Sequence, residues 1–323
     1  MNLGTGGWAS RVLTPLLRII RTSPNATVPV IAISEPVNSE TAALVNADLA
    51  LVAKGTGATL AQVPNGTTAG GDKRGQYATD LQKLRVLSSL VASANYGVIC
   101  GGASNVASGF GHAIVVGGNG NNASNLYSTI VGGTSNTCSG MGGFIGGGSS
   151  NDVAGDYGCI PGGRYGITRN IIGYLAFPAC NAPISTAQGV TQSALLLLGR
   201  QTTDATATIL TSDSSAASAI NQVILPDNAA YSFSGEVIAG VTAAGNTARW
   251  TINGAIKRGF GASTTVLVST PTVTKTHNDA GAAAWTVAVT ADTTNGGIAV
   301  TVTGAASTTI RWVAKITTTE MTF

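Results

Sequence analysis

Residues that could carry acid–base or nucleophilic chemistry are few in this sequence, and none forms a recognised catalytic pattern. The two histidines, His112 and His277, lie in no Ser/His/Asp or Cys/His arrangement and are expected at the surface. Asp152 and Asp156 could approach each other as the carboxylate pair of a glycoside hydrolase, or they could decorate a turn. With only 14 acidic residues in the chain, we expect no catalytic residue and a protein that is not an enzyme.

The cysteines and the glycine-rich segments do not predict a metal or cofactor site. The four cysteines are Cys100, Cys138, Cys159 and Cys180. They lack CxxC spacing and a nearby histidine, so we interpret them as small buried thiols. Segments 117–122 (GGNGNN) and 147–152 (GGSSND) approach a calcium-binding repeat, but the first has no Asp and the second lacks the middle Gly. We therefore expect no metal and no cofactor.

The charge composition narrows the range of partners. Charged residues make up 10% of the chain, against roughly 25% in a typical soluble domain, which favours a surface covered by copies of the same chain. A net charge of +3 does not predict nucleic-acid binding. No segment predicts a membrane span or a secretory signal. The basic residues Lys73, Arg74, Lys83 and Arg85 either face solvent or pair with acidic groups of neighbouring subunits.

A repeat of about fifteen residues organises the middle of the chain. Its glycine pairs are Gly101-Gly102, Gly117-Gly118, Gly132-Gly133, Gly147-Gly148 and Gly162-Gly163. An apolar residue stands two positions before each pair, and an asparagine follows most of them. Such a period allows two short strands and two tight turns per coil, with the apolar residue pointing inward. We therefore predict a β-roll spacer over residues 91–176.

Residues 1–90 are interpreted as a region that attaches the rod to a larger assembly. A short helix is expected from Thr14-Pro15 to Ser23-Pro24, and strands over 27–33 and 48–54. Its apolar residues either pack within an oligomer or dock onto another protein; they are Trp8, Leu13, Leu16, Leu17 and Ile20. Residues 79–90 form either a helix capped by Thr79-Asp80 or an imperfect first coil.

Residues 177–190 read as a linker, and residues 191–323 as a β-sandwich or jelly roll. The clearest hairpin runs from strand 285–291 through Asn295-Gly296-Gly297 to strand 298–302. Three tryptophans in alternating strands are expected in the core: Trp250, Trp285 and Trp312.

Two parts of the chain resemble known families. Segments 130–140 (IVGGTSNTCSG) and 145–155 (IGGGSSNDVAG) resemble the repeats of trimeric autotransporter adhesin heads, which implies a left-handed parallel β-roll packed as a homotrimer. Segments 224–240 and 295–316 resemble the C-terminal module of phage tail fibres, and 66–82 a passage that precedes such repeats. Sustained heptads and a membrane anchor, which the adhesins carry, are not found in this sequence, and this favours a virion fibre.

These resemblances imply a structural and receptor-binding tail fibre of a phage virion. Its expected partners are two further copies of the chain, tail or baseplate proteins at the N-terminus, and a host glycan or outer-membrane protein. The alternatives are a head, collar or decoration protein that binds other virion proteins, and a glycan-cleaving tailspike. Candidate receptor-binding residues, chosen as loop positions, are Tyr231, Phe260, His277, Asn278 and Asp279.

Overall fold

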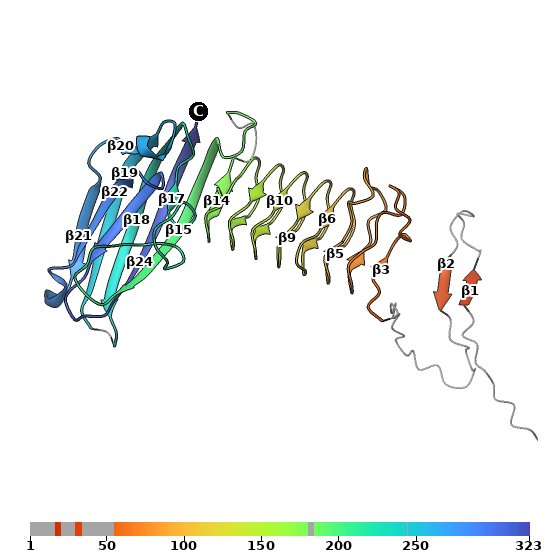
Figure 1. Cartoon of the computed structure of the whole chain (residues 1–323), viewed down its shortest axis with the longest axis horizontal. Coiled ribbons are helices and arrows are strands. Elements are labelled where there is room, and N and C mark those ends of the chain that lie inside the picture. Colours follow the sequence, from red (N-terminus) through yellow and green to blue (C-terminus); the bar gives the residue numbers. More distant parts are fainter. Residues whose placement is uncertain (1–16, 21–29, 34–54, 180–183, 244) are drawn as a thin grey trace, which may run out of the picture. The chain divides into compact units, whose positions relative to one another are not determined.

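The computed structural model describes residues 17–20, 30–33, 55–179, 184–243 and 245–323, which belong to two compact units, Met1–Ala50 and Leu51–Phe323 (Figure 1). In the first unit β1 (Leu17–Ile20) pairs antiparallel with β2 (Val30–Ile33). The predicted helix is therefore wrong at residues 17–20, because two apolar runs rich in β-branched residues pair as strands instead. The predicted strand is confirmed at 30–33, whereas 48–54 lies outside the described residues.

The second unit begins as a β-solenoid, as the repeat predicted. One parallel sheet contains β3 (Thr59–Leu60), β4 (Thr79–Asp80), β5 (Val98–Ile99), β7 (Ile114–Val115), β9 (Thr129–Ile130), β11 (Phe144–Ile145), β13 (Cys159–Ile160) and β14 (Leu175–Pro178). A second contains β6 (Val106–Ala107), β8 (Asn122–Ala123), β10 (Thr137–Cys138) and β12 (Asp152–Val153). Figure 1 shows the coils stacked along one axis. The apolar residue of each repeat is fully buried, as at Ile130 and Ile145.

Buried asparagines and close-packed glycines explain the repeat. The equivalent asparagines are Asn105, Asn121, Asn136 and Asn151, all with no exposed surface. Asn136 Nδ2 donates to the carbonyl oxygens of Gly132 at 3.0 Å and Gly148 at 3.1 Å, so it joins two coils. Gly133 has φ +88°, and a Cβ there would lie 2.0 Å from the Gly148 carbonyl oxygen. The coils can therefore stack closely only with glycine at that position.

The imperfect coil, not the helix, is confirmed at residues 79–90. β4 pairs in parallel with both β3 and β5, and Ala92 forms a parallel bridge with Ala107. Gln82 takes the place of the buried repeat asparagine in this coil: its Oε1 accepts the Asn105 backbone N–H at 2.9 Å. The coil stack thus begins before residue 91.

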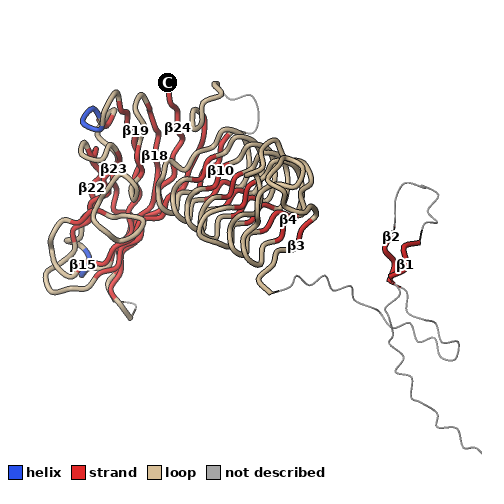
Figure 2. Tube along the Cα trace, turned by 45° about the vertical axis from the view of Figure 1, so that its right-hand side comes forward, coloured by secondary structure: helices blue, strands red, loops and turns tan. Residues whose placement is uncertain are grey.

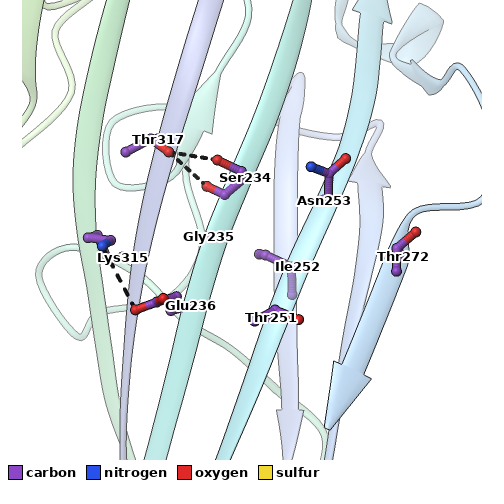
Figure 3. A pocket seen from close by; sticks show the side chains of 9 residues that line it. All are labelled: Ser234, Gly235, Glu236, Thr251, Ile252, Asn253, Thr272, Lys315 and Thr317. Atoms are coloured by element: carbon purple, nitrogen blue, oxygen red, sulfur yellow. Dashed lines mark hydrogen bonds and ion pairs between the residues drawn. The ribbon is translucent and has the colours of Figure 1, made fainter. Parts of the chain in front are cut away.

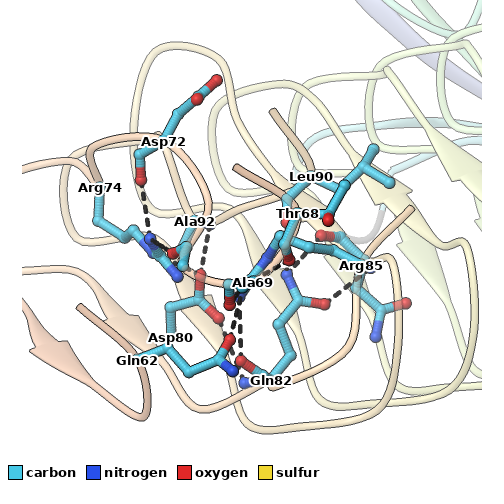
Figure 4. A network of polar contacts seen from close by, with 12 residues as sticks. Gln62, Thr68, Ala69, Asp72, Arg74, Asp80, Gln82, Arg85, Leu90 and Ala92 are labelled. Carbon is cyan, nitrogen blue, oxygen red and sulfur yellow. Dashed lines mark hydrogen bonds and ion pairs between the residues drawn. The ribbon is translucent and has the colours of Figure 1, made fainter. Parts of the chain in front are cut away.

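Two of the basic residues are buried in this first part of the solenoid and form hydrogen bonds within it (Figure 4). Arg74, 4% exposed, donates from Nε to Asp80 Oδ2 at 2.7 Å. Arg85, 3% exposed, donates from Nη1 to Gln62 Oε1 at 2.7 Å and from Nη2 to the Gln82 carbonyl at 3.0 Å. A solvent-exposed role is therefore wrong for both arginines, whereas Lys73 and Lys83 are exposed as expected.

The C-terminal strands continue the solenoid sheet and add a second sheet. The first carries β15 (Thr191–Thr202), β18 (Ala229–Val241), β19 (Thr247–Arg258), β20 (Val266–Leu267), β21 (Thr272–Asn278) and β24 (Ile310–Thr322). The second carries β16 (Thr208–Ile209), β17 (Val223–Ile224), β22 (Thr286–Asp292) and β23 (Gly297–Thr303), and η1 (Ala262–Thr264) and η2 (Ala280–Ala282) are 3-10 turns. The all-β fold is confirmed, and these two sheets are consistent with a β-sandwich (Figure 2). The predicted hairpin is β22–β23.

The three tryptophans lie in the core of this part, as predicted. Trp250, Trp285 and Trp312 are each at most 2% exposed, and the Trp312 ring centroid lies 5.6 Å from Trp250 and 5.9 Å from Trp285. Trp312 Nε1 donates to Thr202 Oγ1 at 2.9 Å, which satisfies its one polar atom.

A buried carboxylate joins the last coil to the C-terminal sheets. Glu320 of β24 is 2% exposed and accepts hydrogen bonds from Arg169 Nε at 3.2 Å, Gln192 Nε2 at 2.8 Å and the Tyr174 hydroxyl. Burial and the neighbouring Glu320 charge raise the pKa of Tyr174 well above its usual value. β14 also pairs antiparallel with β15, with Leu175 opposite Leu195. The solenoid and the C-terminal sheets are thus bonded through both backbone and side chains.

In the part of the chain that the structure describes, no helix has the length and apolar character needed to cross a membrane.

Candidate functional site

A shallow groove of about 440 Å³ lies on the outer face of the C-terminal sheet (Figure 3). Side chains alternate along β18, so Phe233 and Val237 point into the core while Ser234 and Glu236 point outward. The groove is lined by Ser234, Gly235, Glu236, Thr251, Ile252, Asn253, Thr272, Lys315 and Thr317. It therefore combines hydroxyl, amide, carboxylate and ammonium groups on one accessible surface.

Charged and hydroxyl groups of the groove are already paired with one another. Glu236 Oε1 accepts from Arg249 Nη2 at 2.7 Å, and its Oε2 lies 3.8 Å from Lys315 Nζ. The Ser234 and Thr317 hydroxyl oxygens are 2.9 Å apart and hydrogen-bonded. Exposed ion pairs such as these contribute little stability, so these side chains can exchange partners with a ligand at small cost. Such an array suits a ligand that presents many hydroxyl groups.

A glycine shapes the floor of the groove. Gly235 pairs with Ile316 of β24 and with Ile252 of β19. A Cβ at this position would lie 2.5 Å from the Lys315 carbonyl oxygen and 2.9 Å from Ile316 Cδ1. The strands can thus keep their spacing beneath the groove only with glycine here.

The groove contains one carboxylate among its nine lining residues, that of Glu236. Both usual mechanisms of glycoside hydrolysis require two carboxyl groups.

The two aspartates considered as a carboxylate pair lie in the solenoid, away from the groove. Asp156 decorates a turn, where its Oδ1 accepts the Met141 N–H at 2.8 Å. Asp152 lies in β12, and partial burial raises its pKa. Across the described ranges, no group of three or more His, Cys, Asp or Glu side chains could hold a metal ion.

Three of the predicted receptor-binding residues lie in strands and not in the loops where they were expected. Tyr231 lies within β18 and is 1% exposed, so its loop assignment is wrong and it cannot reach a ligand. His277 and Asn278 end β21 and are exposed. His277 pairs in register with Arg249 of β19. This places the end of β21 on the same sheet as the groove.

The remaining predicted residues are placed as follows. Phe260 is 82% exposed after β19, and Asp279 Oδ2 accepts the Thr247 N–H at 2.8 Å. Among the attachment residues, Leu17 and Ile20 lie in β1, whereas Trp8, Leu13 and Leu16 fall outside the described residues.

The cysteines only partly match the prediction of buried thiols. Cys138 is fully buried, and burial raises its pKa to about 12. Cys159 is half-buried and Cys100 is exposed, so the prediction is wrong for Cys100. Cys180 lies outside the described residues. In the two segments that approach the calcium repeat, Asn121 and Asn151 are buried and donate to the Gly133 and Gly163 carbonyl oxygens of the next coil.

The groove is not visible in the sequence. Its residues come from stretches far apart in the chain, around 234–236, 251–253 and 315–317. The one available signal was local: in segment 230–239 (AYSFSGEVIA), polar Ser234 and Glu236 alternate with apolar residues. That pattern predicts an outward-facing polar row but not the strands that lie beside it.

Comparisons with known proteins give structural matches only. No protein-family model matches the sequence, and no curated protein matches it. The tailspike gp49 of Acinetobacter baumannii bacteriophage Fri1, a capsular polysaccharide depolymerase, matches with 10% identity and a TM-score of 0.26, covering 77% of this chain and 50% of its own. The tailspike of Acinetobacter phage vB_ApiP_P1 matches with 12% identity and a TM-score of 0.22, covering 78% and 55%.

A third match is the tailspike of A. baumannii phage AM24, with 10% identity and a TM-score of 0.20, covering 70% of this chain and 46% of its own. The chain thus spans about half the length of the structures that it matches. The expectation that the chain is not an enzyme is contradicted by this comparison, because gp49 is described as a depolymerase.

Proposed function

We propose that this chain is a tailspike-type receptor-binding protein on the exterior of a phage virion, and that it binds a bacterial surface polysaccharide. The observation that carries the proposal is the open polar groove on β18, β19 and β24, which offers hydroxyl, amide and charged groups side by side. A polysaccharide presents hydroxyl groups along its length and can exchange hydrogen bonds with such a surface. Description of all three matched proteins as phage tailspikes agrees with this class.

The proposed assembly is a homotrimer packed through an apolar face of the solenoid. Side chains flanking the inward residues of the longer solenoid sheet point outward, and several are large and apolar. They are Val116, Val131, Phe144 and Phe177, between 39% and 48% exposed. Several large apolar side chains exposed on one face of a sheet are unfavourable in water and are typical of a protein interface. Three copies of the groove would then strengthen binding by avidity.

The N-terminal region is proposed to attach the chain to other virion proteins. This assignment rests on its separation as a compact unit, Met1–Ala50, from the rest of the chain. The alternative of a head or collar decoration protein predicts binding to virion particles without adsorption to bacteria.

The test uses the full-length protein and purified bacterial capsular polysaccharides, beginning with those of A. baumannii. Binding is measured by biolayer interferometry for the wild type and for Lys315→Ala, with Lys83→Ala on the solenoid as the charge-matched control. We expect Lys315→Ala to weaken binding by about tenfold and Lys83→Ala to leave it unchanged. Absence of binding to any bacterial capsule, together with binding to virion particles, would favour the decoration alternative.

Cleavage is measured in the same samples as new reducing ends. Glu236→Gln removes the carboxylate of the groove while preserving its shape. If the groove is the place of cleavage, this variant binds polysaccharide but releases no reducing ends. The second carboxylate required by the usual mechanisms would have to come from outside the nine lining residues.

A further inference from the structure

One edge of the solenoid carries a row of exposed aromatic rings, which we call the aromatic ladder. Its members stand two residues before five strands of the longer sheet, β4, β5, β7, β9 and β13: Tyr77, Tyr96, His112, Tyr127 and Tyr157. The first four stack in sequence, with ring centroids 5.1, 4.8 and 5.3 Å apart. All five are exposed.

The backbone at this position favours glycine. All five aromatic residues have φ between 54° and 59°, a left-handed conformation that costs free energy for any residue with a Cβ. Two coils do have glycine there, Gly142 with φ 62° and Gly173 with φ 74°. The coil can therefore form without an aromatic ring, and the rings need a different explanation.

Mutual stacking supplies that explanation for the first four rings but not for Tyr157. Its neighbours at the equivalent position are Gly142 and Gly173, and no stacked aromatic partner of Tyr157 occurs among the described residues. It is also 62% exposed, more than Tyr77, Tyr96 or Tyr127. Tyr157 thus combines a strained backbone with an exposed ring and no stacking partner.

The two flanking glycines give the Tyr157 ring one supported side and one open side. A Cβ on Gly142 would lie 2.9 Å from Tyr157 Cδ1, so the ring rests close to the Gly142 backbone. Nothing lies within 4 Å of the Cβ position of Gly173. The Gly173 side of the Tyr157 ring therefore carries no side chain at the equivalent position.

Groups beside this position can complete a binding site. The Ile172 N–H donates to the Ile220 carbonyl at 2.8 Å, so a C-terminal loop borders the same coil, and the Ile220 side chain is 39% exposed. Asp156 lies on the other side: its Oδ1 accepts the Met141 N–H at 2.8 Å, so the carboxylate turns toward the Gly142 coil. The site thus offers an aromatic ring and an apolar neighbour.

We propose that Tyr157 and the open position over Gly173 bind one pyranose ring of the surface polysaccharide, as a site separate from the groove on the C-terminal sheet. The apolar C–H face of the sugar would stack on the tyrosine ring, as flat ligands do on aromatic side chains. This inference rests on the proposed polysaccharide-binding function.

Two substitutions test the site without endangering the fold. Tyr157→Gly installs the residue that neighbouring coils already use, so its melting temperature should be unchanged or higher. Gly173→Tyr places a tyrosine where nothing obstructs a Cβ and fills the proposed site. The strain of its φ of 74° and its stacking on Tyr157 oppose each other, so the melting temperature should change little. We expect each variant to weaken polysaccharide binding by about tenfold.

Tyr96→Gly is the matched control, because it removes a ring that is stacked on both sides. It should lower the melting temperature and leave polysaccharide affinity unchanged, the reverse of Tyr157→Gly. Unchanged affinity in both Tyr157→Gly and Gly173→Tyr, with binding by the wild type retained, would overturn the site alone. Failure of the wild type to bind any capsule would overturn the proposed function and this inference with it.

Discussion

The backbone N–H of Asn151 donates a 3.0 Å hydrogen bond to Oδ1 of Asn136, the equivalent residue one coil earlier. Asn136 in turn donates from Nδ2 to carbonyl oxygens of both coils. Both asparagines have no exposed surface. One buried amide therefore satisfies polar groups that would otherwise be unpaired where two coils meet, and this links the repeat in the sequence to the stability of the stack.

Replacing Asn136 by Ala should destabilise the solenoid by about 3 kcal/mol, because it leaves the buried Asn151 N–H and two carbonyls with lost partners. The free energy of unfolding in urea measures the effect. Asn125→Ala is the control, since Asn125 bonds the Ser139 carbonyl at an exposed position. An equal loss of unfolding free energy in the two variants would show that burial does not determine how much the repeat asparagines contribute to stability.

The two glycines of one pair should respond differently to alanine. Gly133→Ala introduces a Cβ at φ +88° that would lie 2.0 Å from the Gly148 carbonyl oxygen, so we expect a loss of at least about 2 kcal/mol. Gly132→Ala meets nothing within 4 Å and should be tolerated. Melting temperatures of both variants decide the matter, and a harmless Gly133→Ala would contradict the close packing described here.

The buried Arg74–Asp80 pair should be far more sensitive than the exposed pair in the groove. Asp80→Asn leaves the buried Arg74 side chain without its counter-charge, and should cost about 3–5 kcal/mol of unfolding free energy. Glu236→Gln, in an exposed pair, should change it by no more than about 1 kcal/mol. A small effect of Asp80→Asn in urea denaturation would argue against a buried pair.

Thiol reactivity and alkaline stability should both reflect the burial of Cys138. Peptide mapping after labelling of the native protein at pH 8 should find Cys100 modified and Cys138 protected. Burial raises the pKa of the Cys138 thiol to about 12 in the folded protein. Its protonated form is thus favoured by folding, and the associated stability is lost as pH rises from about 9 to 12.

Cys138→Ala should reduce the fall in stability across this alkaline range. The free energy of unfolding is measured at several pH values for both proteins. Tyr174 and Tyr231 also have raised pKa values and remain in the variant, so part of the alkaline effect should persist. An identical pH slope in the two proteins would exclude a contribution from Cys138.

The sequence predicted features that repeat and missed those that depend on distant contacts. Inward isoleucines, glycine pairs and the coil period follow from local spacing, and the structure contains them. The local pattern of Leu17–Ile20 favours a helix, because the pairing of this segment with Val30–Ile33 is not visible in the segment itself. Arg74 is an exception: its partners Asp80 and Gly70 are within six residues, but the bends of the coil that bury them together do not follow from the spacing.

The candidate site could be predicted only in outline. Alternation marks Ser234 and Glu236 as facing one side of a strand, but the groove needs Asn253 and Lys315 from strands that pair through the sheet. Tyr231 was misassigned because an aromatic residue near the start of an apolar strand can look like a loop position. Antiparallel register, which brings together residues far apart in sequence, carries the missing information.

The unbroken sheet from β13 through β14 and β15 to β24 has a mechanical consequence. A pull applied at the groove would pass from strand to strand through the hydrogen bonds of this sheet into the coils, and the Glu320 contacts stabilise the same junction. Tension would therefore pass from one end to the other with little bending at the junction. Whatever binds at the groove would therefore be held at a nearly fixed distance from the first coils of the solenoid.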